Sequence, residues 1–337
     1  MKKLINLPSN YVDESLAGLC AAFPGYARAG ATGRVVARRD GAARGKVGVV
    51  TGGGFGHLPV FAGYVGQGLL GACAVGDVFA GPPAEVCAEA IRAADGGAGV
   101  VCVLGNYGGD RMSFANACDE VEDAGIATRT EIVADDVASA APAERQKRRG
   151  VAGMIFAFKV AGARAAAGGS LDEVAAAAAK AAARTRSIGV ALSPCLIPGA
   201  ARPGFSLGEG EIEIGMGIHG EPGLERRALP PADEVTAELV RRLLDDAPAE
   251  SASPRRRVAI LVNSLGATPL EELLIVYRKA AELIGAAGID IARRYVGHYA
   301  TSMEMAGCSV SLLFLDAELE SLLDAPTDCP FWPRAQC

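Results

Sequence analysis

The sequence predicts an α/β protein made of two α/β domains, each a mostly parallel or mixed sheet flanked by helices. The length of 337 residues suits two domains of roughly 150 residues each. Glycine occurs 43 times while aromatic residues make up only 5% of the chain, which is typical of many tight strand-to-loop junctions. Short apolar runs also alternate with helical stretches along the chain.

The first half of the chain carries the alternation most clearly. Apolar runs at residues 47–51, 98–104 and 130–134 each stop at glycine or aspartate, and a helical pattern covers residues 83–93. Buried runs that alternate with helices predict parallel strands joined by right-handed crossovers. The carboxyl ends of such strands meet at one sheet edge, where ligands of open α/β sheets bind.

A capping box marks the start of an alanine-rich helix, because Ser170 stands three residues before Glu173. A second capping box is predicted at Thr268 and Glu271, with Pro269 at the favoured first helical position. We place the domain boundary near residue 185, which gives an N-terminal domain of residues 1–185 and a C-terminal domain of residues 186–337. Further strands are predicted in the second domain at residues 187–192, 212–216, 258–262 and 309–314.

Composition argues against several classes of protein. The net charge of −6 provides no basic face for a phosphate backbone, so nucleic acid is not an expected partner. No run of about 20 apolar residues and no apolar leader core are present, which predicts a cytoplasmic protein that spans no membrane. The nine cysteines form no C-x-x-C pair and are expected to be buried, reduced thiols. The polar stretch 247–257 is expected to be an exposed loop.

His57 lies in the loop Thr51-Gly-Gly-Gly-Phe-Gly-His-Leu-Pro59, directly after a predicted strand. The loop matches neither the dinucleotide fingerprint nor a phosphate-binding P-loop. Two interpretations stay open from the residues alone. The histidine is either structural within a strained turn, or a polar group aimed into a cleft at the strand end.

Asp110 ends a second glycine-bearing loop, Asn106-Tyr-Gly-Gly-Asp110, after another predicted strand. Its carboxylate either caps a helix that begins near Met112 or acts as a general base close to His57. The two loops are expected to be neighbours because both emerge from the same sheet edge.

The third candidate, His219, is surrounded by glycines in Gly215-Met-Gly-Ile-His-Gly-Glu-Pro222. A neutral imidazole in such a loop can attack a reactive carbonyl, although the signal is weak by itself. His298 has no comparable loop and is expected to be structural. The three histidines show no metal-binding spacing, so no metal site is predicted.

Taken together, the motifs closely resemble the K subunit of dihydroxyacetone kinases, from end to end and in order. The resemblance rests on Met1-Lys-Lys-Leu-Ile-Asn6, Gly52-Gly-Gly-Phe-Gly-His57, Gly63-Tyr-Val-Gly-Gln-Gly68, Asn106-Tyr-Gly-Gly-Asp110, Arg148-Arg-Gly-Val-Ala152, Ser187-Ile-Gly-Val-Ala191, Gly217-Ile-His-Gly-Glu-Pro-Gly223 and Asn263-Ser-Leu-Gly-Ala-Thr268.

The resemblance implies a ketose bound between two α/β domains. It implies that His219 attacks the ketose carbonyl to form a covalent hemiaminal, and that His57 and Asp110 serve the acid–base step at the attacking hydroxyl. This chain would itself bind no cofactor, because ATP or ADP with Mg belongs to a partner nucleotide-binding L-type subunit. The phosphoryl donor is open between ATP and a phosphocarrier of the phosphotransferase system. A homodimer is also implied by the resemblance.

The sequence departs from the family at the substrate loops. Phe55 and Leu58 replace a serine and a glutamate, Gly105 stands in place of a lysine, and Ala80-Gly81 replaces a threonine–serine pair. Because these changes remove polar groups around the sugar, they predict a preference for erythrulose or a branched pentulose over dihydroxyacetone. Alternatively, other side chains or ordered waters fill the gap and dihydroxyacetone stays the substrate. The residues expected to contact substrate are Gly53, Gly54, Phe55, Gly56, Leu58, Gly81 and Gly105.

A second functional class resembles the K subunit as well. Ketose-sensing paralogues bind sugar without phosphorylating it and contact a transcription factor. A sensor needs only the covalent histidine, so the retention of His57 and Asp110 favours the enzyme.

Overall fold

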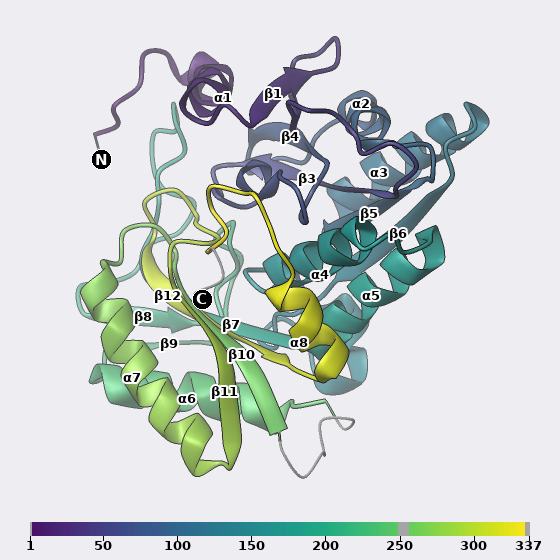
Figure 1. The fold of residues 1–337 in the computed structure, drawn as a ribbon. Helices are drawn as coiled ribbons and strands as arrows, with labels where there is room; N and C mark the ends of the chain where they lie inside the picture. Colours follow the sequence, from purple (N-terminus) through teal and green to yellow (C-terminus); the bar gives the residue numbers. More distant parts are fainter. Residues whose placement is uncertain (1, 249–255, 334–337) are drawn as a thin grey trace.

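The computed structural model describes residues 2–248 and 256–333, which form two six-stranded sheets flanked by helices (Figure 1). The helices are η1 (Pro8–Asn10), α1 (Tyr11–Ala22), η2 (Ala62–Tyr64), α2 (Ala84–Ala94), α3 (Gly108–Asp123), η3 (Pro142–Lys147), α4 (Met154–Ala166), α5 (Leu171–Arg184), α6 (Ala232–Asp245), α7 (Leu270–Ala286) and α8 (Ala317–Asp324). The predicted fold class, two mixed sheets flanked by helices, is confirmed.

The first sheet has the strand order β1-β2-β4-β3-β5-β6. Strand β3 runs parallel to β5, and β5 runs parallel to β6, as the alternation of strands and helices predicts. Strand β4, which also runs parallel to β3, was not among the predicted strands. The short strands β1 and β2 add an antiparallel edge that the sequence reasoning did not anticipate. The strands are β1 (Tyr26–Ala29), β2 (Val35–Arg38), β3 (Gly48–Phe55), β4 (Ala72–Val78), β5 (Val100–Gly105) and β6 (Thr128–Val133).

The second sheet has the order β11-β10-β12-β7-β8-β9 and is antiparallel except for the pair β10 and β11. All four strands predicted in this half are present, and β9 and β11 are additional. The strands are β7 (Thr185–Ser193), β8 (Glu211–Ile214), β9 (Glu225–Ala228), β10 (Arg256–Ser264), β11 (Ile289–Gly297) and β12 (Ala306–Phe314). Of the predicted loop 247–257, residues 249–255 lie outside the described residues, while Arg256 and Arg257 begin β10.

Helices cover the sheets in layers. Residues of α2 and α3 pack against one face of the first sheet, and residues of α6 and α7 pack against one face of the second. Helices α4, α5 and α8 share a single hydrophobic core with residues of both sheets, including Ala259 and Leu313 of the second. The two sheets are therefore joined through a common apolar layer.

The chain enters the second sheet at Thr185, directly after α5. After β12 the chain returns to the first half of the molecule, where α8 packs on α4 and buried Lys159 donates a hydrogen bond to the carbonyl of Leu322 at 2.7 Å. We keep the division near residue 185 as a proposal, in which the segment after β12 is packed against the first domain.

Two local predictions about helix starts have different outcomes. The capping box at Ser170 is present, with both reciprocal hydrogen bonds to Glu173 formed. The box predicted at Thr268 is wrong, because the Thr268 hydroxyl bonds the backbone of Gly307 instead and Pro269 is itself the N-cap of α7. A tertiary partner on β12 thus replaces the local one.

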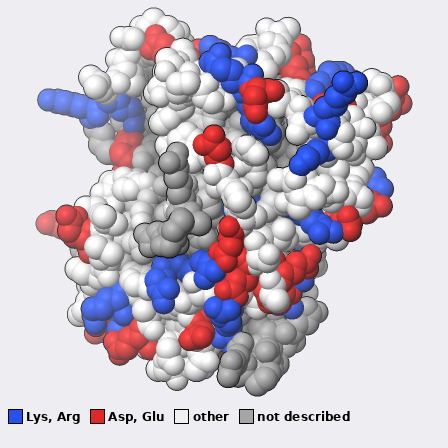
Figure 2. All heavy atoms as spheres, viewed as in Figure 1, with Lys and Arg blue, Asp and Glu red and all other residues white. Residues whose placement is uncertain are grey.

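The structure also bears on the predictions about cysteines, membrane spans, metal sites and surface charge. Seven of the eight described cysteines are buried and all eight are free thiols, whereas Cys337 lies outside the described residues. Within the described ranges, no helix is long and apolar enough to cross a membrane, and no three potential ligand side chains group as a metal site. Basic and acidic side chains are interspersed over the face shown in Figure 2.

Candidate active site

The structure brings the predicted residues His57, Asp110 and His219 together from two loops and the first turn of a helix. His57 follows β3, Asp110 lies in the first turn of α3 after β5, and His219 follows β8 of the second sheet. The imidazole centroids of His57 and His219 are 4.9 Å apart, with the rings at 72°. Helix α3 begins at Gly108 rather than near Met112, so Asp110 lies within the helix instead of before it.

His57 is 1% exposed, and its tautomer follows from one hydrogen bond. Its Nδ1 lies 2.7 Å from the carbonyl oxygen of Thr301, which can only accept, so Nδ1 carries the proton. The lone pair is therefore on Nε2, which is buried without a hydrogen-bond partner among the described residues. Burial lowers the pKa of His57 to about 3, helped by the nearby charge of His219. The ring stacks on Phe79 at 4.7 Å.

The carbonyl that orients His57 is that of Thr301, which lies between β11 and β12 of the second sheet. Asn263, at 0% exposure on β10, accepts hydrogen bonds from the amides of Tyr299 and Ala300 at 2.9 Å each, and donates to the Ala300 carbonyl at 2.7 Å. The next amide, that of Thr301, donates to the His57 carbonyl at 3.2 Å. Asn263 therefore holds the segment that fixes the proton on His57.

Asp110 is also buried, at 9% exposure, and its Oδ1 has no hydrogen-bond partner among the described residues. Burial raises the pKa of the Asp110 carboxyl to about 6, while the charge of His219 acts in the opposite direction. The carboxyl can therefore exchange a proton close to neutral pH, which is the property a general base or acid requires.

His219 lies in a loop with two glycines in the left-handed region, Gly215 at φ +80° and Gly220 at φ +86°. Its Nδ1 is 3.0 Å from Oε1 of Glu221, and its backbone amide donates to the other carboxylate oxygen at 3.0 Å. The carboxylate accepts, so Nδ1 carries a proton, and in the neutral imidazole it is Nε2 that has the lone pair needed by a nucleophile. The His219 side chain is 24% exposed, and the ring of Tyr107 meets it edge-on at 4.9 Å.

Glu221 is a candidate site residue that sequence reasoning missed, because its carboxylate contacts both the ring and the backbone amide of His219. Burial alone would raise the pKa of Glu221, but hydrogen bonding and charge interaction with His219 lower it to about 2. The signal was available, because an acidic residue two positions after a histidine in a glycine-rich loop can reach back to its ring. The carboxylate is therefore ionised at neutral pH.

The glycines of the His57 loop make room for protein. A Cβ at Gly53 would stand 2.1 Å from the ring of Phe61, and a Cβ at Gly54 would stand 2.7 Å from the backbone nitrogen of Ala80. Gly56 has a φ of +104°, which side chains rarely adopt. These glycines thus let neighbouring segments close against β3, and their contact with a substrate stays a proposal.

The substituted positions Phe55, Leu58 and Gly105 have different surroundings. Phe55 and Leu58 line a cavity of about 410 Å³ together with residues 2–5 and Met303, and the predicted histidines and Asp110 are not among its lining residues. A Cβ at Gly105 would stand 2.9 Å from the sulfur of Met154. The side chain of Met154 therefore occupies the space beside Gly105. This agrees with the alternative in which other side chains fill the gap left by the missing lysine.

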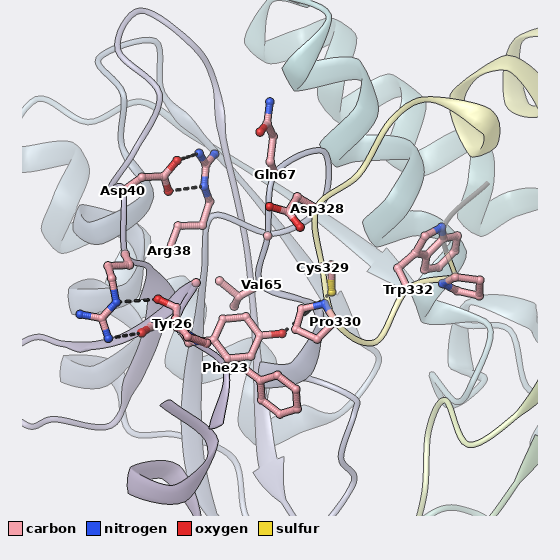
Figure 3. Close-up of a pocket in the computed structure, with 15 residues that line it drawn as sticks. Phe23, Tyr26, Arg38, Asp40, Val65, Gln67, Asp328, Cys329, Pro330 and Trp332 are labelled. Carbon is pink, nitrogen blue, oxygen red and sulfur yellow. Dashed lines mark hydrogen bonds and ion pairs between the residues drawn. The ribbon is translucent and has the colours of Figure 1, made fainter. Parts of the chain in front are cut away.

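A larger cavity of about 760 Å³ lies elsewhere, between β1, β2 and the segment after α8 (Figure 3). Its arginines already have partners. Arg38 pairs with Asp40, as Figure 3 shows. Arg39 donates to two backbone carbonyls. None of the predicted site residues lines this cavity. The larger cavity and the predicted site residues therefore lie apart.

Comparison with known proteins agrees with the fold and the loops. The model of the Dak1 domain matches residues 17–331. The chain belongs to this family. It is 40% identical to the dihydroxyacetone-binding subunit DhaK of the PTS-dependent dihydroxyacetone kinase 1 of Listeria innocua, over 98% of this chain and 100% of that protein. It is 42% identical to the D-erythrulose kinase of Mycolicibacterium smegmatis, over 99% of this chain but only 57% of that protein.

Two solved structures of the Dak1 family align with nearly the whole chain. The dihydroxyacetone kinase of C. freundii in complex with AMP-PNP and Mg²⁺ aligns with a TM-score of 0.88 and 32% identity, over 99% of this chain and 61% of that chain. The dihydroxyacetone kinase operon co-activator Dha-DhaQ aligns with a TM-score of 0.89 and 31% identity, over 96% of this chain and 98% of that chain. The chain therefore spans only part of the longer kinases and nearly all of the shorter proteins.

Proposed function

We propose that this Dak1 chain is the ketose-binding subunit of a dihydroxyacetone-type kinase. It holds a short ketose as a hemiaminal on His219, while a partner nucleotide-binding subunit brings the phosphoryl group. The observation that supports this most is the grouping of a lone pair on His219 with two buried, unpartnered polar atoms, Nε2 of His57 and Oδ1 of Asp110.

The covalent step begins with Nε2 of His219, which attacks the ketose carbonyl carbon. A carbon–nitrogen bond forms, the carbonyl π bond opens, and the carbonyl oxygen takes up a proton to become a hydroxyl. The imidazole ring gains positive charge, which the ionised carboxylate of Glu221 stabilises through the Nδ1 proton at 3.0 Å. The anchor fixes the position of the reacting hydroxyl for the transfer that follows.

In the transfer step, a terminal hydroxyl of the ketose attacks the phosphorus atom and loses its proton, while the bond from phosphorus to the donor breaks and the donor leaves. Asp110 suits the role of base because its raised pKa of about 6 lies close to neutral pH. His57, whose Nε2 accepts but does not donate, suits the role of orienting that hydroxyl. The rest of the barrier is lowered by positioning and by charge stabilisation at the phosphoryl group.

We assign the binding of the phosphoryl donor to a partner subunit. In the C. freundii kinase structure with AMP-PNP and Mg²⁺, this chain matches 61% of the polypeptide, which leaves room there for a nucleotide-binding part. We therefore propose that ATP, or ADP recharged by a phosphotransferase-system phosphocarrier, is held with Mg²⁺ by a separate subunit. The purified chain should bind no ATP and phosphorylate no ketose until that subunit is added, and ATP-dependent turnover by the chain alone would refute the assignment.

The substrate is proposed to be a three- to five-carbon ketose, with a tetrulose such as erythrulose preferred over dihydroxyacetone. Support comes from the erythrulose kinases among the relatives rather than from free volume, since Met154 occupies the space beside Gly105. A panel of C3 to C5 ketoses, assayed with the partner subunit, decides the question. A tenfold preference for dihydroxyacetone over every larger ketose would contradict the proposal.

A second candidate, a ketose-sensing co-regulator, is favoured by the co-activator structure that aligns over 96% of this chain. The buried pair of His57 and Asp110 favours the kinase, because a sensor has no use for an acid–base group. Binding to a transcription factor, with no turnover when a nucleotide-binding subunit is present, would favour the sensor. We also propose a homodimer, and a monomer in analytical ultracentrifugation at micromolar concentration would contradict it.

A further inference from the structure

The motif Arg148-Arg-Gly-Val-Ala152 lies in the segment between β6 and α4, which reaches from the first sheet to the second. Asp136 of this segment forms a parallel β-bridge with Ser187 of β7, and its backbone amide donates to the carbonyl of Arg149 at 3.1 Å. Strand β8 lies beside β7 in the second sheet. The segment therefore brings the side chain of Arg149 close to residues 215–224, the connection between β8 and β9 that we call the His219 loop.

The guanidinium of Arg149 contacts both ends of the His219 loop. It donates to the carbonyl of Gly215, directly after β8, at 2.7 Å, and more weakly to the carbonyl of Pro222, shortly before β9, at 3.5 Å. Its Nε donates to Oδ2 of Asp136 at 2.8 Å. The side chains of Arg149 and Asp136 are only 13% and 3% exposed, so water screens their ion pair little. This pair fixes the guanidinium against the base of the loop.

The loop itself leaves room for the guanidinium. An ideal Cβ at Gly217 would stand 2.7 Å from Nη1 of Arg149 and 2.1 Å from Oε2 of Glu221, and both distances are shorter than real Cβ contacts. The φ of Gly217 lies outside the left-handed region, so the lack of space favours glycine there more than the backbone conformation does. The guanidinium at the base of the loop and the carboxylate that bonds the ring of His219 therefore lie on either side of one glycine.

We propose that Arg149 is a positioning residue for the covalent step on His219. The first half of the chain supplies His57 and Asp110, whereas the His219 loop belongs to the second sheet, and the Arg149 guanidinium links the two. Without this link the loop should move more freely, so that the ring of His219 is less often in place to attack a ketose carbonyl. The inference rests on the proposed function of His219.

The first measurement compares the isolated full wild-type chain with Arg149→Lys. Lysine keeps the positive charge but lacks the planar fork with which arginine reaches Asp136 and both loop carbonyls at once. Rapid-mixing mass spectrometry with excess erythrulose gives the rate at which the adduct forms on His219. We expect this rate to fall by about 10- to 100-fold, the cost of misplacing a reacting group by about 1 Å.

Hydrogen exchange of the loop amides shows whether Arg149 acts by ordering the loop. The amides of Gly217 and Gly220 donate within the loop, to the carbonyls of Glu221 and Gly217, at 3.0 Å each. In Arg149→Lys both amides should exchange faster by about tenfold, as expected for local opening of one segment. The amides of β5, in the centre of the first sheet, should exchange as in the wild type.

Arg148→Lys is the matched control, because it also breaks a buried ion pair of the same segment. The side chain of Arg148 is 1% exposed and bonds Asp246 through two nitrogens, at 2.9 and 2.6 Å. Its other hydrogen bond among the described residues goes to the carbonyl of Ala140, away from the His219 loop. This variant should unfold at lower urea concentration, yet keep the wild-type adduct rate and loop exchange. The exposed Arg145→Lys on η3 should match the wild type in all three measurements.

A second variant keeps the test open if Arg149→Lys does not fold, as judged by near-UV circular dichroism. Arg149→Met combined with Asp136→Asn removes both charges, so that no buried charge is left without a partner, and should slow the adduct and loosen the loop in the same way. Adduct formation at the wild-type rate in a folded Arg149 variant overturns the proposal. Equal slowing in Arg148→Lys, or a slower adduct with unchanged loop exchange, also overturns it.

Failure of the proposed function would look different. In that case the wild type would form no ketose adduct on His219 at all, whatever the loop exchange shows in the Arg149 variants. An adduct that forms equally fast in wild type and Arg149→Lys contradicts the role of Arg149 alone and leaves the covalent step on His219 in place.

Discussion

The ring centroids of His57 and His219 are 4.9 Å apart, yet the two imidazoles differ in exposure and in the charge of their hydrogen-bond partners. His57 is 1% exposed, bonded only to a neutral carbonyl, and has its pKa lowered to about 3. The His219 side chain is 24% exposed and bonded to a carboxylate. The comparison teaches that burial without a charged partner keeps the imidazole of His57 neutral, whereas the loop of His219 places a carboxylate in hydrogen-bond contact with the second imidazole.

The same contrast extends to the two carboxyl groups. Asp110 is buried with an unpartnered oxygen, and its pKa is raised to about 6. Glu221 is paired with His219, and its pKa is lowered to about 2. The carboxyl of Asp110 is thus suited to moving a proton near neutral pH. The carboxylate of Glu221 is suited to stabilising charge on His219 during a covalent step.

The largest expected effect concerns the covalent anchor. His219→Ala should abolish the ketose adduct, because no other described imidazole is both exposed to the site and paired with a carboxylate. Intact-protein mass spectrometry with excess ketose measures the adduct. His57→Ala should keep it, and an adduct that persists in His219→Ala would show that the covalent residue lies elsewhere.

The next effect separates chemistry from anchoring. His57→Ala and Asp110→Ala should each lower turnover by roughly 10²–10⁴-fold, the usual range for a positioned acid or base, while the adduct still forms. Steady-state assays with the partner subunit give the turnover, and mass spectrometry gives the adduct. Loss of both properties together would mean that these residues build the pocket and take no part in proton transfer.

Stability gives a third test, in which function and folding oppose each other. The pKa of Asp110 rises on folding from its usual 3.8 to about 6, so folding binds a proton between these values and the unfolding free energy falls as pH rises through that window. At pH 7 the cost is about 3 kcal/mol, since one pKa unit corresponds to about 1.4 kcal/mol. Asp110→Asn should therefore raise the unfolding free energy at pH 7 by up to about this amount, as measured by urea denaturation. Between pH 4 and 6, the unfolding free energy of the variant should fall less steeply with rising pH than that of the wild type. A less stable Asp110→Asn protein at pH 7 would contradict the burial argument.

The smallest effect sharpens the role of the paired carboxylate. Glu221→Gln keeps the shape of the side chain and removes its charge, so the adduct on His219 should form about tenfold more slowly, since each 1.36 kcal/mol of lost transition-state stabilisation is tenfold in rate. The exposed Glu225→Gln on β9 is the matched control. Rapid-mixing mass spectrometry gives the rate, and equal rates in the two variants would remove Glu221 from the covalent step.

Much of the fold could be predicted because the signals are local. The apolar runs that became β3, β5, β6, β7, β8, β10 and β12 are continuous in sequence, and Ser170 caps α5 with a partner three residues away. The strands β1 and β2 have only four residues each, and β11 is an edge strand with polar residues, so neither periodicity nor apolar length identified them. The capping box at Thr268 failed because its hydroxyl found a partner 39 residues away.

The sequence by itself determined the two α/β units, the family resemblance, and the three loops that carry His57, Asp110 and His219. Only the tertiary structure decided what each side chain can do there. The proton on His57 is placed by Thr301, 244 residues further along the chain, and the volume beside Gly81 holds an oxygen of Asp110. The physical reason is that burial and hydrogen bonding set protonation, and both depend on contacts between segments far apart in the sequence.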